Sequence, residues 1–330
     1  MEQNCEIIDV QVNYGDTPYG PNSDFELYRN NAERIGIARA VIYPTPTHIH
    51  QQNSIIETSC YWRPGNMGNS RYYLTLKNQE TGNVTTVEQP KNPFRNFNIA
   101  VLEFVRNFNA TRNAIRLHFT PKIHPILDDK SALEELIGDE TVMLKIHGLA
   151  THTNPDDIPT WVVEMLIHYD LPLVAHTDYI DLDTAKRRSA MEQELNELCA
   201  QNSPLAHIHW ALKNNVRMII NHGARLDPEA INIINNEEKL IMAHGPDSHL
   251  EARQDHLVTK TDDYVETLFR MADPDSVMFS TDYRWNVGIA CNWDAMRWDS
   301  IERLRKVLSP DDANKVLSEN AFKFLRIPKS

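Results

Sequence analysis

Short apolar segments of this sequence repeatedly end in side chains that can ligate metals or transfer protons. In chain order these end residues are Gln11 and Asn13, His118, Lys145 and His147, His176, His222, His244 and Asp282. A lone histidine at such a position is usually a hydrogen-bonded core residue. Several of them converge, however, if the segments are parallel strands whose carboxyl ends meet at one face. Imidazole, carboxylate and amine groups gathered there predict acid–base or metal-assisted chemistry.

The segments have the composition of strands buried on both faces, because they are short and rich in Val, Ile and Leu. They cover residues 7–13, 37–43, 114–119, 141–147, 172–177, 216–222, 239–244 and 276–282. Their first residues are separated by 30, 77, 27, 31, 44, 23 and 37 positions. A barrel of alternating strands and helices uses about 30 residues per unit. Helical periodicity at residues 97–112, 159–169 and 262–271 supplies the intervening helices.

This alternation predicts an α/β fold, a single (β/α)8 TIM-barrel domain over residues 1–330. An open doubly wound sheet is the alternative, which we disfavour because no glycine-rich nucleotide loop follows a strand. The two long separations predict insertions at residues 44–95 and 178–203, both on the face that carries the site. Within the first, residues 71–88 surround Thr81-Gly82-Asn83 and predict a β-hairpin insertion that caps this face.

The composition limits the partners. Asp and Glu number 46 against 33 for Lys and Arg, which gives a formal net charge of −13. An acidic surface repels phosphate backbones and anionic lipids, so we expect no nucleic-acid or membrane partner but a small-molecule substrate. The first residues are acidic and polar, unlike a secretory signal, and the four cysteines are too sparse for a disulfide framework. We therefore expect a cytoplasmic protein and leave open whether it forms a homo-oligomer.

The ordered set of strand-end motifs resembles the amidohydrolase superfamily, and most of all its amidohydrolase-related branch, which includes aminocarboxymuconate-semialdehyde decarboxylase-like members. The matching segments are IDVQVN at 8–13, LKIH at 144–147, PLVAHT at 172–177, INHG at 220–223, MFSTDY at 278–283 and the closing SENAFKFL at 318–325. The resemblance implies a TIM barrel with a divalent metal. In the family this metal is held by an HxH pair on the first strand, a histidine on the fifth and an aspartate on the eighth.

This sequence departs from that pattern on the first strand, where Gln11 and Asn13 replace the two histidines. Carboxamides are poor zinc ligands beside imidazoles and carboxylates. Some N-acetylglucosamine-6-phosphate deacetylases of the same superfamily look similar in carrying QxN there, and they keep one metal on the histidines of the fifth and sixth strands and a carboxylate. That likeness implies one divalent ion, expected to be zinc, on His176 and His222. Lys145 as its carbamate would be the third ligand, with His118 or His147 as alternatives.

The expected chemistry is hydrolysis of a small-molecule amide, ester or lactone by metal-activated water. Asp282 and His222 are the predicted catalytic residues, with Asp282 accepting the proton of the water. The predicted substrate-binding residues are Gln11, Asn13, Arg225, Arg284, His147 and His244. Two alternatives remain: a lyase of the same superfamily, either a decarboxylase or a hydratase, and a metal-free binding protein. The presence or absence of bound metal would distinguish the metal-dependent hydrolase from the metal-free binding protein. Release of CO₂ would identify a decarboxylase.

Overall fold

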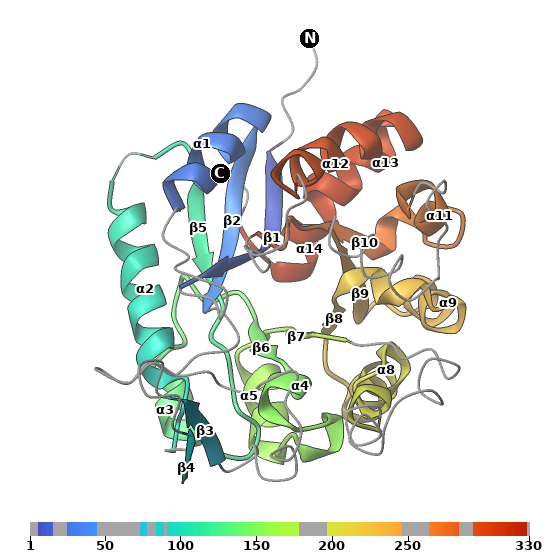
Figure 1. Ribbon diagram of the computed structural model, residues 1–330. Helices are drawn as coiled ribbons and strands as arrows, with labels where there is room; N and C mark the ends of the chain where they lie inside the picture. The colour runs from blue at the N-terminus through green and yellow to red at the C-terminus, as the bar shows by residue number, and fades with distance from the viewer. Residues whose placement is uncertain are drawn as a thin grey trace.

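Eight parallel strands form a ring in the computed structural model, which describes residues 6–15, 25–44, 73–77, 84–88, 91–111, 113–177, 197–245, 264–283 and 293–328 (Figure 1). The strands are β1 (Ile7–Tyr14), β2 (Ile37–Pro44), β5 (Arg116–Phe119), β6 (Leu144–Ile146), β7 (Leu173–Ala175), β8 (Met218–Ile220), β9 (Leu240–His244) and β10 (Val277–Phe279). Each overlaps one of the predicted segments, so the prediction of an α/β fold with parallel strands is confirmed.

The ring consists of two hydrogen-bonded sheets that meet at two seams. One sheet has the order β1-β2-β5 and the other the order β10-β9-β8-β7-β6. Parallel bridges between Phe119 and Thr141 and between Lys122 and Lys145 join the chain at β5 to that at β6. A parallel bridge between Val12 and Tyr283 joins β1 to the residues that follow β10. The first and last strands are therefore neighbours, as a closed barrel requires.

Helices surround the ring of strands (Figure 1). They include α1 (Phe25–Ile35), α2 (Arg95–Asn109), α3 (Lys130–Glu134), α4 (Gly148–Thr151), α5 (Thr160–His168), α8 (Pro204–Asn214), α9 (Pro228–Asn236), α11 (Tyr264–Phe269), α12 (Trp293–Val307) and α13 (Pro310–Asn314). Helix α8 shows why such segments are helical: the Ser203 side chain caps its start, and Asn215 ends it in the left-handed conformation. Within the described part of the chain, no helix has the length and hydropathy that crossing a membrane requires.

The apolar core lies in two layers because successive strand residues point to opposite faces. The interior layer includes Ile8, Val41, Val174 and Ile219, and the outer layer packs under the helices. Helix α14 (Asn320–Leu325) contributes Phe322 and Leu325, among others, to the interior layer. It therefore closes the end of the barrel at which the strands begin and leaves the other end to polar residues.

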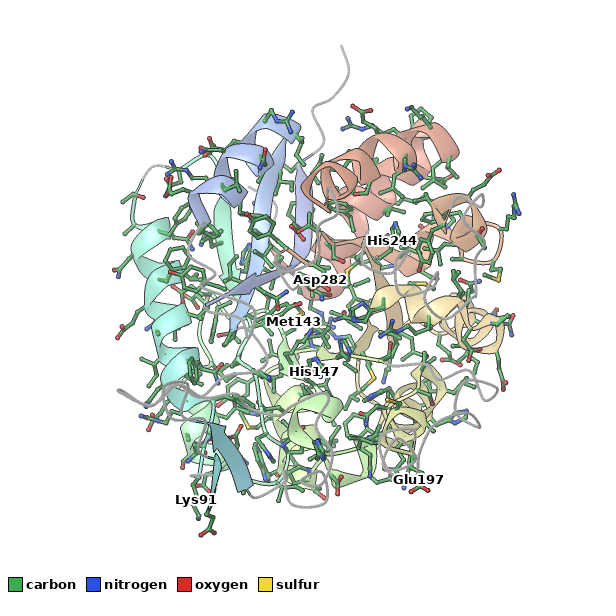
Figure 2. The ribbon with its side chains drawn as sticks, viewed as in Figure 1. Lys91, Met143, His147, Glu197, His244 and Asp282 are labelled. Atoms are coloured by element: carbon green, nitrogen blue, oxygen red, sulfur yellow. The ribbon has the colours of Figure 1, made fainter. Side chains whose placement is uncertain are left out.

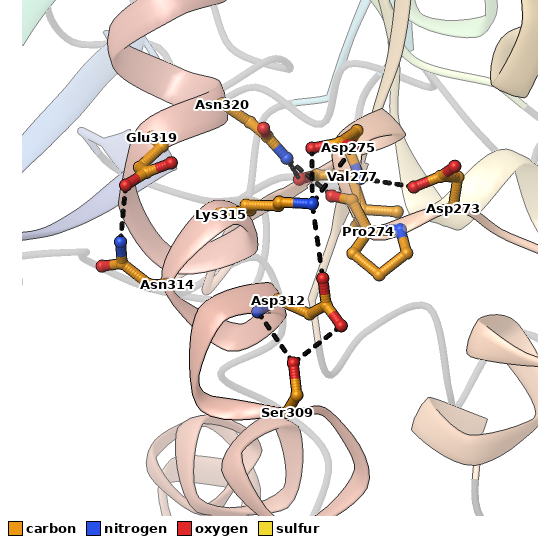
Figure 3. Close-up of polar contacts among 10 residues, drawn as sticks. All are labelled: Asp273, Pro274, Asp275, Val277, Ser309, Asp312, Asn314, Lys315, Glu319 and Asn320. Atoms are coloured by element: carbon orange, nitrogen blue, oxygen red, sulfur yellow. Dashed lines mark hydrogen bonds and ion pairs between the residues drawn. The ribbon is translucent and has the colours of Figure 1, made fainter.

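Polar contacts fix this closing segment to the start of β10 (Figure 3). The Asn320 side chain donates to the carbonyl oxygens of Pro274 and Val277, at 2.7 and 2.8 Å. Lys315 Nζ lies 3.1 Å from an Asp275 carboxylate oxygen and 3.4 Å from one of Asp312. The strand that leads to Asp282 is thus anchored at its beginning.

The two predicted insertions are described only in part. Strands β3 (Tyr73–Lys77) and β4 (Val84–Glu88) pair antiparallel, from Tyr73 opposite Glu88 to Lys77 opposite Val84. The turn of the predicted hairpin, residues 81–83, lies outside the described residues. Residues 178–196 of the second insertion also lie outside them. The cap and the domain boundaries remain predictions.

Candidate functional site

Three histidines from neighbouring strands meet where the strands end. His147 follows β6, His176 follows β7 and His222 follows β8. His176 Nδ1 and His222 Nε2 are 2.9 Å apart, and the rings of His147 and His176 stack with centroids 3.8 Å apart. In Figure 2 the labelled His147 and Asp282 lie toward the middle of the ring, and His244 lies at the side of β9 and β10. Lys91 and Glu197 lie at the periphery. The structure thus brings together the two histidines of the predicted metal site, His176 and His222.

Burial keeps two of these imidazoles neutral. It holds the pKa of His222 well below its ordinary value, and the charge of Arg225 adds to the effect. It does the same to the pKa of His147, with His176 as the next cause. Both residues are therefore unprotonated at pH 7 and can accept a proton or ligate a metal through a ring nitrogen.

Asp282 is held by the two carboxamides of the first strand. Its Oδ1 accepts hydrogen bonds from Gln11 Nε2 at 2.5 Å and from Asn13 Nδ2 at 3.0 Å. Asn13 Nδ2 also donates to the carbonyl oxygen of Tyr283, at 3.3 Å. The amides that replace the family's histidines thus act as hydrogen-bond donors to the aspartate. That Gln11 and Asn13 also bind the substrate remains a prediction.

Lys145, on β6, is buried beside this carboxylate. Its Nζ donates to Tyr43 Oη at 3.3 Å and lies 4.3 Å from the centre of the Tyr43 ring. Burial lowers the pKa of Lys145 to about 8, although the negative charge of Asp282 opposes the change. The Lys145 side chain is therefore mostly in its cationic form at pH 7. An ammonium group cannot ligate a metal, so the predicted ligand role requires the carbamate.

Sequence reasoning missed Lys122, which forms a parallel bridge with Lys145. The Lys122 side chain is buried, and its Nζ lies 4.3 Å from the centre of the Phe94 ring. Asn98 on α2 binds the backbone N–H and carbonyl oxygen of Lys122, at 2.9 and 2.8 Å. The available signal was weak, because Pro121 separates this lysine from the apolar segment that predicts the strand.

The other predicted residues are placed as follows. Arg225 is buried and donates from Nε to the carbonyl oxygen of Thr177 at 2.9 Å. The His244 ring stacks on that of Tyr264, with centroids 5.3 Å apart. Burial lowers the pKa of His118 to about 3, with Arg39 and Arg116 as further causes. Arg284 lies outside the described residues.

A complete metal-binding group does not form from the described residues. Two donors fit a divalent ion, namely the neighbouring nitrogens of His176 and His222. Gln11 and Asn13 do not fit, because their NH₂ groups are directed at Asp282. No three His, Cys, Asp or Glu side chains of the described ranges gather as ligands. The third protein ligand of the predicted site is therefore not identified by the geometry.

Three solved structures share this fold. A candidate 2-pyrone-4,6-dicarboxylic acid hydrolase of Pseudomonas putida matches with a TM-score of 0.56 and 10% identity over 99% of each chain. IDCase of Metarhizium anisopliae, in apo form, matches with a TM-score of 0.53 and 10% identity over 97% of each chain. Dihydroorotase of Campylobacter jejuni matches with a TM-score of 0.57 and 14% identity, over 100% of this chain and 87% of that one. At such identities the likeness shows a common fold.

Sequence comparison carries the assignment further. No curated protein matches the chain. A family profile described as Amidohydrolase, however, matches residues 123–327, which is more than half of the chain. The match includes the strands that carry Lys145, the histidines and Asp282. The chain therefore belongs to the amidohydrolase family.

Proposed function

We propose that this protein hydrolyses an amide, ester or lactone bond of a small molecule, with Asp282 as the proton acceptor. The observation that carries the proposal is the Asp282 carboxylate, fixed by two amide donors beside the buried Lys145. Family membership supports an enzyme of this class. The hydrolase named for one structural neighbour is consistent with this reaction.

The residues divide the chemistry between them. Hydrogen bonds from Gln11 and Asn13 to Oδ1 orient the Asp282 carboxylate, which accepts a proton from the attacking water and returns it to the leaving group. The Lys145 ammonium group stabilises negative charge that develops on the carbonyl oxygen, because burial strengthens its field. In this proposal the neutral His147 hydrogen-bonds the substrate.

A divalent ion, zinc, forms part of the proposal because enzymes of this family are typically metal-dependent. His176 and His222 are the residues that would hold it. When bound, such an ion polarises a carbonyl group and lowers the pKa of water. The roles of Asp282, Gln11 and Asn13 given above do not depend on which residue completes its ligand set. The role of Lys145 requires that a residue other than Lys145 completes it, because an ammonium group cannot ligate a metal.

A lyase that acts on a carboxylate is the second candidate. It is favoured by the juxtaposition of Lys122 and Lys145 across a parallel bridge, since amine side chains bind carboxylates. In a decarboxylase these residues would hold the substrate, and the bond broken would be a carbon–carbon bond. The two candidates differ in what happens to water: hydrolysis adds its oxygen atom to the product, whereas decarboxylation does not.

Product analysis in H₂¹⁸O tests the proposal. A panel of small lactones, amides, esters and dicarboxylates is incubated with the zinc-supplemented protein and with the D282N variant. Hydrolysis predicts one ¹⁸O atom in the acid product and its loss with D282N. Release of CO₂ without incorporation of ¹⁸O would support the lyase instead, and turnover undiminished by D282N would contradict the assignment of Asp282 as the proton acceptor.

A further inference from the structure

The seam between β1 and β10 is joined by side chains more than by a regular ladder. The two strands belong to different sheets. The backbone N–H of Asn13 meets the carbonyl oxygen of Tyr283 at 3.4 Å, a long contact. Asp282 lies on one side of this seam, and the amides that hold it lie on the other. Whatever fixes the seam therefore fixes the distance between them.

Asp9, a fully buried residue of β1, spans this seam with four hydrogen bonds. Its Oδ1 accepts from the backbone N–H groups of Thr281 and Gln11, at 2.9 and 3.2 Å. Its Oδ2 accepts from Thr281 Oγ1 at 2.6 Å and from Tyr28 Oη at 3.0 Å. Three of the four donors thus belong to the residue preceding Asp282 and to the residue whose amide binds it.

A buried carboxylate at this place needs a reason, because burying a charge is unfavourable unless it is well hydrogen-bonded. Burial raises the pKa of Asp9 to about 6, although the hydrogen bonds from Thr281, Gln11 and Tyr28 oppose the change. An apolar residue would leave the N–H groups of Thr281 and Gln11 without this acceptor. The carboxylate therefore keeps both groups in place at neutral pH.

The backbone of Asp282 adds a second, independent observation. Its φ angle is +45°, in the left-handed region that residues other than glycine seldom adopt. Such a conformation persists only where the surroundings impose it. The Asp9 carboxylate accepts hydrogen bonds from both the N–H and the hydroxyl of Thr281, the residue immediately before Asp282. These hydrogen bonds restrain the chain at the point where the turn begins.

We propose that Asp9 is a positioning residue for the reaction: by clamping Thr281 and Gln11 across the β1–β10 seam, it holds Asp282 in the left-handed turn that presents its carboxylate. Asp9 acts through these neighbours and does not touch the substrate. The inference rests on the proposed function in taking Asp282 as the proton acceptor.

Crystal structures of D9A and D9N test the placement without any need for activity. In D9A, we expect Asp282 to leave the left-handed region and the contact between its Oδ1 and Gln11 Nε2 to exceed 3.5 Å, the usual limit of a hydrogen bond. In D9N, an amide oxygen can still accept from the two N–H groups while the NH₂ donates to Thr281 Oγ1, so the wild-type geometry should be retained. Y28F is the matched control, because it removes the one hydrogen bond of Asp9 that leads away from Asp282.

Kinetics on p-nitrophenyl acetate, or on a substrate from the panel, then test the role. D9A should lower kcat about 10- to 100-fold, the usual effect of losing an outer-shell partner, with KM changed less than about threefold. D9N should restore most of kcat, and Y28F should keep it. In a D282N background, D9A should have no further effect, because the group that it positions is already inactive.

An unmoved Asp282 in crystals of D9A would overturn the proposal, as would an equal loss of kcat from D9A in the wild-type and D282N backgrounds. If the wild-type protein hydrolyses no compound tested, the proposed function fails. The position of Asp282 in D9A still decides the inference about Asp9 in that case.

Discussion

At the residue scale, the site combines a carboxylate with an amine that burial makes less basic. The Asp282 carboxylate accepts hydrogen bonds from the amides of Gln11 and Asn13. Lys145, close enough for its pKa to respond to Asp282, supplies a positive charge in a region of low polarity. Such a pair can move a proton and stabilise an anion in the same step.

Replacing Lys145 by methionine should separate stability from activity. The pKa of Lys145 falls from 10.5 to about 8 on folding, so burying the ammonium costs about 3 kcal/mol at pH 7. K145M removes this cost and a hydrogen bond to Tyr43, and we expect the free energy of unfolding at pH 7 to rise by about 1–3 kcal/mol. The kcat should fall by about 100-fold. Urea unfolding and initial rates measure the two effects, and a variant that is less stable yet fully active would contradict both.

The same lysine predicts an alkaline limit to activity. The ammonium form is present below the folded-state pKa of about 8 and is lost as pH rises through it. We expect kcat/KM to decline above pH 8 in proportion to the protonated fraction. K145R is the control, because arginine stays charged and should remove the decline from this range. A pH profile that is flat up to pH 10 in the wild-type protein would refute the assignment.

At the element scale, one end of the barrel is closed by α14 and the other end carries the candidate site. Helix α14 and the segment before it hold the start of β10, whereas Asp282 follows the end of that strand (Figure 3). Changes at the closed end should therefore affect stability and leave the chemistry intact.

Asn320 provides the test of this separation. N320A leaves the carbonyl oxygens of Pro274 and Val277 without their donor, and we expect a loss of about 1–3 kcal/mol in the free energy of unfolding. The kcat at 25 °C should stay within about twofold of wild type. N314A is the control, because its hydrogen bond to Glu319 is exposed and should contribute less than about 0.5 kcal/mol. Thermal or urea denaturation compares the two variants, and equal losses would contradict the anchoring role.

The strands and several helices were predictable because their signal is local. Buried parallel strands are apolar runs, and α5 (Thr160–His168) lies within the helix predicted at residues 159–169. Contacts between distant residues were not predictable. The hydrogen bond between Gln11 and Asp282 joins positions 271 residues apart, and Asp9 reaches Thr281 over 272. Lys122 was missed since a bridge, rather than a continuous strand, places it.

At the scale of the whole molecule, membership of the amidohydrolase family is confirmed by the match over residues 123–327. The resemblance to the aminocarboxymuconate-semialdehyde decarboxylase-like branch, the absence of a nucleic-acid partner and the oligomeric state remain predictions. The whole chain has a formal net charge of −13, yet the cations Lys122, Lys145 and Arg225 are buried.

Metal content is a property of the whole molecule that the proposal predicts. Protein purified without chelator from zinc-supplemented medium should carry about one zinc per chain, and H176A and H222A should each lose it. D282N should retain the metal, because the proposal uses its carboxylate for proton transfer. Elemental analysis measures all four proteins. Stoichiometric zinc in H176A and H222A would place the metal elsewhere.

The central claim is that Asp282 takes the proton from water, and the kcat of D282N tests it most directly. Asparagine keeps the size of the side chain but cannot accept a proton at neutral pH. On a substrate that the wild-type protein hydrolyses, we predict that D282N lowers kcat by about 10²–10⁴-fold, with KM within about threefold of wild type. A kcat within about threefold of wild type, in a variant whose folding is intact, would contradict the account.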